Sequence, residues 1–287
     1  MRLGGVDEWF GGWLNIDEEI ARKIADLGFT GMGLHYKGDP IDQPLEEALR
    51  TKALLTEHGI EIVQFWGEYP SLLTPDEAVR REGIRQTRNA VRRAAELGAH
   101  MASIRPTSMH PTEQWGPHPL NYAPETEERL VRSLSEIAET AEALQIPVAL
   151  EVHVTSTLRS AEVIRDIIER TGSSWLKVNA DLVNFIPDFA TAYNTTPLIN
   201  HVYDVLGPYI VNAHLKDVVV SPPLIVHINE AIPGTGLLDW DTLFGRFEAL
   251  LPNGYALIEH LKDYEQVRQA RDFVVGKLDA LNISVLR

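Results

Sequence analysis

Eight short apolar runs alternate along this chain with longer segments of helical periodicity, and this alternation constrains the fold more than any other feature. Such alternation is typical of parallel βα units, in which a buried strand is followed by a helix that covers the sheet. Eight βα units predict an α/β protein with a (β/α)8 TIM barrel, and a doubly wound sheet is the weaker alternative. The runs that we expect to be strands are 2–6, 31–35, 60–66, 101–105, 148–153, 176–181, 210–215 and 255–260.

The segments between these runs carry helix start and stop signals. The third helix is expected to have Thr74 as its N-cap, with a proline in the first helical position, and to end at Gly98. The fourth begins near Pro124 and stops before Pro147, because proline cannot continue a helix. No segment resembles a linker, so residues 1–287 are predicted to form a single domain. The other expected helices are 17–27, 45–58, 160–171, 197–206, 239–251 and 263–281.

Composition excludes several classes of function. The chain has 41 Asp and Glu against 26 Lys and Arg, a formal net charge of −15 at pH 7. A nucleic-acid binder needs a basic surface, so no nucleic-acid partner is expected. The absence of cysteine excludes thiolate metal sites and a cysteine nucleophile. No apolar run approaches the roughly 18 residues of a membrane span, and the first ten residues do not resemble a secretory signal. We therefore expect a cytoplasmic protein with no membrane partner.

Polar residues stand at the carboxyl ends of the last four expected strands. In a TIM barrel this is the end at which the chemistry takes place. Side chains alternate along a strand, so a residue that faces the mouth brings the residue two positions away with it. The four strands therefore offer the mouth Glu151, Asp181, His214 and Glu259.

Three carboxylates packed into one mouth would repel one another, and burial would raise their pKa values. A divalent cation removes that penalty. Oxygen ligands with one imidazole suit Mn²⁺ best, with Co²⁺, Mg²⁺ or Zn²⁺ as alternatives. The other interpretation is four separate strand ends, each with its own salt bridge or hydrogen bond. Four such ends on consecutive strands favour a metal site.

The segments around these residues are LEVH at 150–153, NADLVN at 179–184, HLKD at 214–217, PGTGLLDW at 233–240 and LIEH at 257–260. Together they resemble the metal-binding strand ends of the sugar phosphate isomerase/epimerase superfamily, the group with a xylose isomerase-like TIM barrel. This group includes ketose 3-epimerases, hydroxypyruvate isomerase, inosose dehydratase and endonuclease IV. The similarity covers most of the chain and is strongest between residues 150 and 260.

The resemblance implies that Glu151, Asp181, His214 and Glu259 are metal ligands. In the ketose epimerases of this group, the two ligand glutamates also exchange protons on opposite faces of the substrate, a catalytic role that would fall to Glu151 and Glu259. The expected function is a divalent-metal-dependent isomerase or epimerase that removes a proton next to the carbonyl of a keto- or aldo-sugar. The expected partner is a small carbohydrate, and a homo-oligomer is a further expectation.

The chain departs from the ketose epimerases at three positions, where Thr157, Asn184 and Val220 replace a Glu, a His and an Arg. His153 stands two residues past Glu151 and is expected to face the mouth as a catalytic acid or base, with orientation of Glu151 as its alternative role. A base that is not a metal ligand suits elimination. The second hypothesis is therefore a lyase that acts on a 3-keto-sugar or an inosose.

Lys216 is also expected to face the mouth. There it would hold a substrate oxygen or form an ion pair with Asp217 or another mouth carboxylate. His260 is expected to face outward.

Three more residues are candidates for substrate binding. Arg105 ends the fourth expected strand, where it would meet an anionic group of a substrate. Trp66 ends the third and would stack on a sugar ring. His227 lies in one of three expected long loops, 7–13, 106–122 and 218–237, and long loops in compact domains are usually functional.

Two other functions are weaker alternatives. An endonuclease-IV-like phosphodiesterase would need more histidine ligands and a basic groove, which the net charge of −15 disfavours. A barrel without catalytic activity that serves as a partner subunit would bind no metal.

Overall fold

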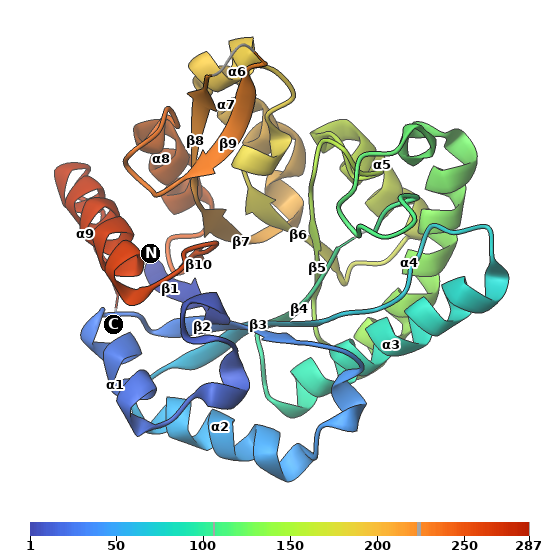
Figure 1. Cartoon of the computed structure of the whole chain (residues 1–287), viewed down its shortest axis with the longest axis horizontal. Helices are drawn as coiled ribbons and strands as arrows, with labels where there is room; N and C mark the ends of the chain where they lie inside the picture. The colour runs from blue at the N-terminus through green and yellow to red at the C-terminus, as the bar shows by residue number, and fades with distance from the viewer. Residues whose placement is uncertain (106, 223–224, 287) are drawn as a thin grey trace.

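The computed structural model of the chain describes residues 1–105, 107–222 and 225–286, so 106 and 223–224, in two of the three expected long loops, and 287 lie outside it. In the described part, eight parallel strands close into a barrel in the order β1-β10-β7-β6-β5-β4-β3-β2, with helices around the outside (Figure 1). The expected α/β fold, a (β/α)8 TIM barrel, is confirmed. The barrel strands are β1 (Arg2–Val6), β2 (Gly31–Tyr36), β3 (Glu61–Gly67), β4 (Met101–Ile104), β5 (Val148–Glu151), β6 (Leu176–Asp181), β7 (Ile210–Leu215) and β10 (Tyr255–Ile258).

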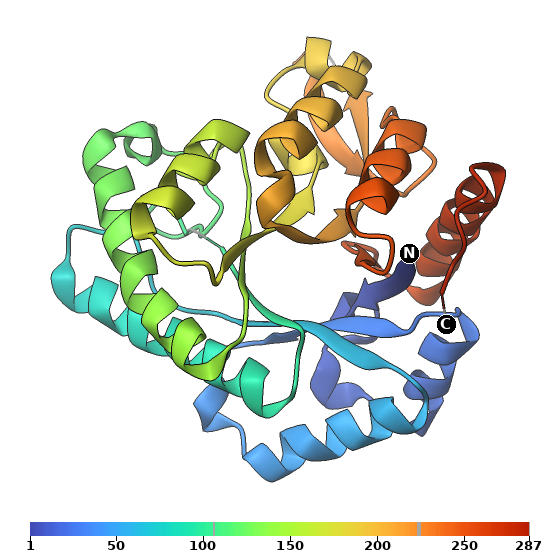
Figure 2. The same cartoon turned by 180° about the vertical axis from the view of Figure 1, so that it is seen from behind.

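A layer of helices surrounds the barrel, and Figure 2 shows this layer from behind. Each expected helix forms, with small shifts at the ends, and the short α6 is an addition. The helices are α1 (Glu18–Asp26), α2 (Leu45–Glu57), α3 (Glu77–Glu96), α4 (Pro124–Leu144), α5 (Ala161–Thr171), α6 (Phe189–Tyr193), α7 (Thr196–Leu206), α8 (Trp240–Leu250) and α9 (Tyr264–Ala280).

The start of α3 differs from the expectation. The side chain of Asp76 accepts hydrogen bonds from the backbone N–H groups of Ala78 and Val79, at 2.9 and 3.2 Å. Thr74 accepts a bond from the N–H of Asp76 instead, so the prediction of Thr74 as the N-cap is wrong. The Asp76 carboxylate reaches two free N–H groups and places negative charge at the positive end of the helix.

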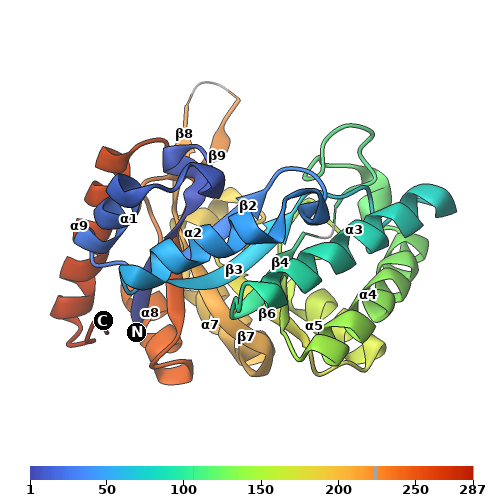
Figure 3. The same ribbon diagram turned by 90° about the horizontal axis from the view of Figure 1, so that it is seen from below.

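The segment after β7 forms an antiparallel hairpin where a loop was expected. β8 (Asp217–Ser221) pairs with β9 (His227–Ala231), with Asp217 at the base and His227 near the tip. The β-branched run Val218–Val220 favours a strand. Figure 3 shows the hairpin on the end of the barrel opposite the two chain termini, which is the carboxyl end of the strands.

Asp217 holds the segment that follows the hairpin. Its carboxylate accepts hydrogen bonds from four backbone N–H groups and from the indole of Trp240. A Cβ atom at Gly236 would lie 2.4 Å from Asp217 Oδ1, so a larger residue would push the loop off this carboxylate. Because Asp217 is directed at the loop, the ion pair considered between Lys216 and Asp217 does not form among the described residues.

Two β-bulges change which side chains face the barrel interior. The pairing register shifts where β2 meets β3 and where β6 meets β7, which leaves Val63 and Val211 without a partner in the register. A bulge turns the residue that follows it out of the simple alternation. Gln64 and Asn212 are hydrogen-bonded to each other, and Gln64 also contacts the ring of His214. Below them, apolar side chains fill the barrel: Val6, Val63, Met101, Ala149, Tyr255 and Leu257.

Candidate metal centre

The four polar strand ends converge at the barrel mouth. Glu151 and Asp181 end β5 and β6, His214 is the last but one residue of β7, and Glu259 directly follows β10. Each offers one ligand atom, and these atoms all lie within 4.8 Å of one another. Asp181, His214 and Glu259 are buried, whereas Glu151 is partly exposed. The alternation of side chains along the strands therefore predicted the meeting of these residues.

Two cations neutralise the carboxylates of this cluster. Lys216 Nζ lies 2.7 Å from Asp181 Oδ2 and 2.9 Å from Glu259 Oε1. His214 Nδ1 lies 2.7 Å from Glu259 Oε2 and 3.7 Å from Glu151 Oε1. The alternative role of Lys216, an ion pair with mouth carboxylates, is thus the arrangement in the structure.

The pKa values in the cluster follow from burial and these charges. Burial raises the pKa of Asp181 to about 7, although Lys216 opposes the shift. Burial alone would lower the pKa of His214, but Glu259 and Glu151 outweigh it and raise the pKa to about 10. For Glu259 the same balance runs the other way, because His214, His260 and Lys216 hold its pKa well below the usual range.

The donor set fits a divalent cation. Asp181 Oδ2, Glu259 Oε1 and His214 Nδ1 have ionic neighbours within 3 Å, yet they make no well-directed hydrogen bond among the described residues. Their contacts are therefore attractions between charges rather than a satisfied hydrogen-bond network. Three carboxylate oxygens and one imidazole nitrogen at this spacing are ligands that Mn²⁺, Mg²⁺, Co²⁺ or Zn²⁺ accept.

A buried amide pair supports His214 from below. Gln64 Nε2 lies 2.8 Å from His214 Nε2, and Asn212 Nδ2 donates to Gln64 Oε1 at 2.8 Å. The contact at Nε2 turns Nδ1 toward the carboxylates, as expected for the outer partner of a metal-binding histidine. Sequence reasoning did not name Gln64, although alternation along β3 places it on the same face as Trp66, two residues further on.

A cavity of about 290 Å³ opens beside the cluster. Ring side chains and ionisable groups from both halves of the barrel line it. The lining residues are Glu8, His35, Trp66, Arg105, Trp115, Glu151, His153, Asn184, His214, Glu230, Glu259 and His260.

His153 lines this cavity although β5 ends two residues before it. Its Nδ1 lies 2.7 Å from Thr155 Oγ1 and accepts a bond from the backbone N–H of Thr155 at 3.3 Å. The ring also packs against Trp115, with centroids 5.5 Å apart. Burial, and secondly the charge of Lys216, lowers the pKa of His153. The imidazole is therefore held in place and neutral near pH 7.

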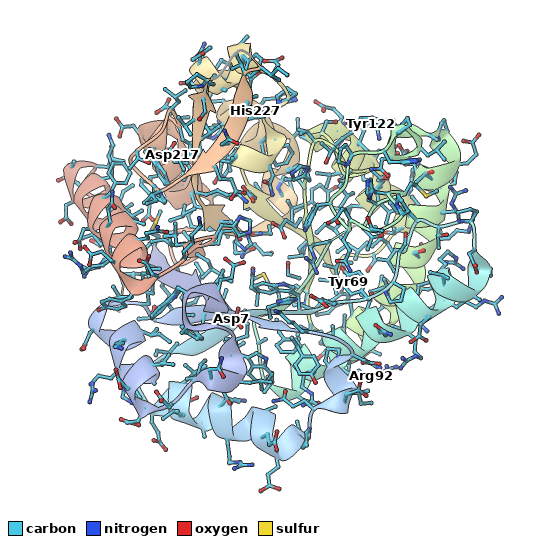
Figure 4. The ribbon with its side chains drawn as sticks, viewed as in Figure 1. Asp7, Tyr69, Arg92, Tyr122, Asp217 and His227 are labelled. Carbon is cyan, nitrogen blue, oxygen red and sulfur yellow. The ribbon has the colours of Figure 1, made fainter. Side chains whose placement is uncertain are left out.

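The other predicted substrate-binding residues are placed differently from one another. Arg105 and Trp66 line the cavity. Lys216 is almost fully buried behind it, against Asp181 and Glu259. His227 lies exposed near the tip of the hairpin and is not part of the cavity wall (Figure 4).

His260 faces the cavity, so the prediction that it faces outward is wrong. Its backbone is left-handed, with a φ of 58°, because β10 ends at Ile258 and the alternation stops there. His260 Nδ1 lies 2.9 Å from the carboxylate of Glu230, and the backbone N–H of His260 donates to the carboxylate of Glu8 at 2.9 Å. Glu8 and Glu230 thus join the site from the first and seventh connections, where the sequence had indicated long loops without assigning either glutamate a role.

The fold and the cluster define a TIM-barrel protein with a candidate metal centre at the carboxyl ends of its strands. The family model described as xylose isomerase-like TIM barrel matches residues 21–275, and the chain belongs to this family. The resemblance inferred from the strand-end segments is thereby confirmed. No curated protein is similar enough in sequence to count as a match.

Several solved structures share the fold. D-psicose 3-epimerase from Clostridium cellulolyticum H10, solved with D-tagatose, is 18% identical with a TM-score of 0.73, over 97% of this chain and 99% of that one. The apo 3-keto-D-glucoside 4-epimerase from E. coli is also 18% identical, with a TM-score of 0.69 and the same coverage. A xylose isomerase-like TIM barrel protein from Mycobacterium smegmatis, in complex with magnesium, is 14% identical with a TM-score of 0.72, over 97% of each chain. At these identities the likeness shows a common fold.

Among the helices of the described residues, none is both long and apolar enough to cross a membrane. A cytoplasmic location and a homo-oligomer stay predictions from the sequence.

Proposed function

We propose that this chain is a divalent-metal-dependent isomerase or epimerase that acts on a keto- or aldo-sugar. The observation that carries the proposal is the convergence of Glu151, Asp181, His214 and Glu259, with ligand atoms within 4.8 Å of one another, beside a cavity of about 290 Å³. The similar folds named as sugar epimerases support the choice of a carbohydrate substrate and of this reaction class.

These four residues would hold the metal, with Mn²⁺ expected and Co²⁺, Mg²⁺ or Zn²⁺ as alternatives. When bound, the ion supplies polarisation of the substrate carbonyl, which makes the neighbouring C–H group more acidic. Glu151 and Glu259 line the cavity and would exchange the proton. One of the two, as a carboxylate, would take the proton from the carbon beside the carbonyl, and the other, as a protonated acid, would give its own proton to the opposite face.

His153 favours a second candidate, a lyase. Its ring lines the cavity, is held through Nδ1 by Thr155, and stays neutral near pH 7 because burial lowers its pKa. Such an imidazole is suited to take a proton, or to give one to a departing hydroxyl group, without being a metal ligand. Thr157, which replaces a glutamate of the ketose epimerases, is buried and donates to a backbone carbonyl outside the cavity wall.

Two measurements test the proposal. Purified protein should hold about one divalent ion per chain after incubation with Mn²⁺, by mass spectrometry of the metal. With ketohexoses and aldohexoses in D₂O, NMR should show deuterium at the carbon beside the carbonyl. A protein that binds none of Mn²⁺, Co²⁺, Mg²⁺ and Zn²⁺ would contradict both the isomerase and the lyase.

The variant His153→Ala separates the two candidates. If deuterium exchange persists while elimination from 3-keto-sugars or inososes stops, the enzyme is a lyase. If isomerisation or epimerisation continues unchanged, His153 transfers no proton in the reaction. His201→Ala is the matched control, because His201 is an exposed histidine on α7 that pairs with Glu162.

A further inference from the structure

The backbone of Arg105 is held at the cavity wall by hydrogen bonds. It directly follows β4 and lines the same cavity as Glu151 and His214. The hydroxyl group of Tyr69 donates to the carbonyl of Arg105 at 2.8 Å and accepts from its N–H at 2.7 Å. Tyr69 is itself buried and lies next to the barrel (Figure 4). The backbone of Arg105 is therefore held in position by two bonds.

Two nitrogen atoms of the Arg105 guanidinium group lack a hydrogen bond. Its Nε and Nη2 atoms are buried and make no hydrogen bond among the described residues, and no carboxylate of that part of the chain lies within 4.0 Å of them. The group lies over the ring of Trp115, whose centroid is 5.7 Å from Cζ. Burying charged donors without acceptors is unfavourable, and a ligand acceptor would relieve this cost.

Another buried arginine has partners for the two atoms that Arg105 leaves without a hydrogen bond. Arg93, on α3, directs Nε at Glu96 at 3.0 Å and donates from Nη2 to the carbonyl of Gln43 at 3.0 Å, although its own Nη1 lacks a hydrogen bond among the described residues. At Arg105 neither Nε nor Nη2 has such a partner there.

His35 adds a further unsatisfied nitrogen to this side of the cavity. Its Nε2 is buried without a hydrogen bond among the described residues, and Glu68 Oε1 is 3.9 Å away, beyond hydrogen-bond distance. The ring stacks on Trp66 with centroids 5.5 Å apart. Burial, and secondly the charge of Arg105, lowers the pKa of His35 to about 4, so the ring is neutral and adds no second positive charge.

We propose that the substrate carries a carboxylate group, which Arg105 binds through Nε and Nη2 while the carbonyl end of the substrate lies against the metal ligands. This inference rests on the proposed function and names the substrate class as sugar acids. Nε and Nη2 form one edge of the guanidinium, and two parallel N–H groups match the two oxygens of a planar carboxylate.

The composition of the cavity wall favours a carboxylate over a phosphate ester. Arg105 is the only Lys or Arg among the described lining residues, and three glutamates besides Glu151 stand in the same wall. A phosphate group brings more negative charge and a third oxygen, for which the described wall offers no second guanidinium. The volume of about 290 Å³ is at the small end for ligand sites and suits a single sugar unit.

Calorimetry of the Mn²⁺-loaded protein tests the inference with two matched pairs of probes, D-glucuronate against D-glucose and D-fructuronate against D-fructose. At least one acid should bind at least about tenfold more tightly than its parent sugar, as expected for a charge-assisted pair. Arg105→Gln should abolish this preference and leave the affinity for the neutral sugar within about twofold. Arg246→Gln is the control, because Arg246 also lies over a ring, Tyr203, but outside the cavity.

Arg105→Lys provides a second variant if Arg105→Gln does not fold. It keeps the charge and loses the two-pronged geometry, so most of the preference should disappear. Equal affinities for acid and parent sugar in the wild type, no saturable binding of either acid, or a preference that survives in both variants would overturn the inference.

The metal content separates this result from that of the proposed function. A protein that holds the metal and binds only neutral sugars keeps the proposed function and loses the carboxylate site. A protein that binds the acids through Arg105 but holds no metal keeps the carboxylate site and loses the proposed function.

Discussion

The two halves of the barrel mouth hold their polar groups in different ways. On the metal half, formed by β5, β6, β7 and β10, the carboxylates face cations of the same chain, as Asp181 and Glu259 face Lys216 at 2.7 and 2.9 Å. On the substrate half, formed by β2, β3 and β4, Arg105 and His35 have buried nitrogen atoms without a hydrogen bond among the described residues. Atoms of the metal half such as Asp181 Oδ2 also lack a hydrogen bond, but they lie close to an opposite charge, whereas Arg105 has no carboxylate within 4.0 Å among the described residues.

This difference teaches how each half is recognised. Like charges meet in the metal half, where the chain's own cations offset the charge that the proposed metal would offset. The substrate half is recognised by buried donors that have no hydrogen-bond acceptor. Such donors can be identified only when the structure shows the neighbours of each one. If the two halves act independently, a substitution in one half should leave the role of the other half unchanged, and the largest effect is expected in the metal half.

Glu259→Gln should separate metal binding from folding. The amide keeps the shape of the side chain but removes the charge that faces His214 Nδ1 at 2.7 Å. We expect less than a tenth of an ion per chain and a loss of turnover of about 10³-fold, because both a ligand and a proton-transfer group are lost. Metal analysis and NMR assays measure the two effects. Glu265→Gln, an exposed residue of α9 paired with Arg268, is the control, and an unchanged metal content in Glu259→Gln would count against the site.

Lys216→Met should destabilise the metal-free protein more than the metal-loaded protein. Without this cation, the buried Asp181 and Glu259 lose their close partner, and removal of one member of a buried ion pair costs about 3–5 kcal/mol. Mn²⁺ should recover part of the loss, as measured by urea unfolding with and without EDTA. Lys277→Met, at a surface pair with Asp241, should change the free energy of unfolding by less than about 1 kcal/mol. Equal losses with and without metal would show that Lys216 does not substitute for the ion.

The sequence predicted the metal half better than the substrate half, and regular strands explain the difference. Glu151, Asp181 and His214 lie within β5, β6 and β7, where strict alternation decides which way a side chain points. The alternation stops where the strand stops. His260 follows the end of β10 with a φ of 58°, which turns it into the cavity against the prediction.

The neighbours of Arg105 could not be predicted for a related reason. The strand pattern placed Arg105 at the mouth, but Trp115 and Tyr69 contact it from connections whose course no periodicity describes. The bulge at Val63 could not be predicted either, because a bulge adds one residue without changing the apolar character of the strand. Loop contacts and bulges depend on tertiary packing, so the pattern of one strand does not contain them.

Asp7→Asn should change how stability depends on pH. Asp7 is buried on the substrate side and accepts bonds from the N–H groups of Trp13 and His35 (Figure 4). Burial raises its pKa from 3.8 to about 7. A raised pKa gives stability that is fully present below pH 4 and is lost as the pH rises through 7. Relative to the wild type, Asp7→Asn should therefore gain on the order of 4 kcal/mol between pH 4 and pH 8, by urea unfolding. A difference that does not vary with pH would contradict the raised pKa, and a difference that changes in the opposite direction would show that Asp7 pairs with a cation.

The smallest effects should come from the hairpin, and they define where the metal half ends. Glu230 and His227 lie on the same strand, β9, but only Glu230 lines the cavity, where it contacts Lys216 at 3.2 Å and His260 at 2.9 Å. Glu230→Gln weakens both contacts, so we expect kcat/KM to fall about tenfold, as for the loss of one partly exposed charged contact. His227→Ala removes an exposed ring near the tip and should change kcat/KM by less than about twofold. An equal loss in the two variants would place His227 against the substrate, as the sequence had suggested, and would mean that the hairpin folds over the mouth during the reaction.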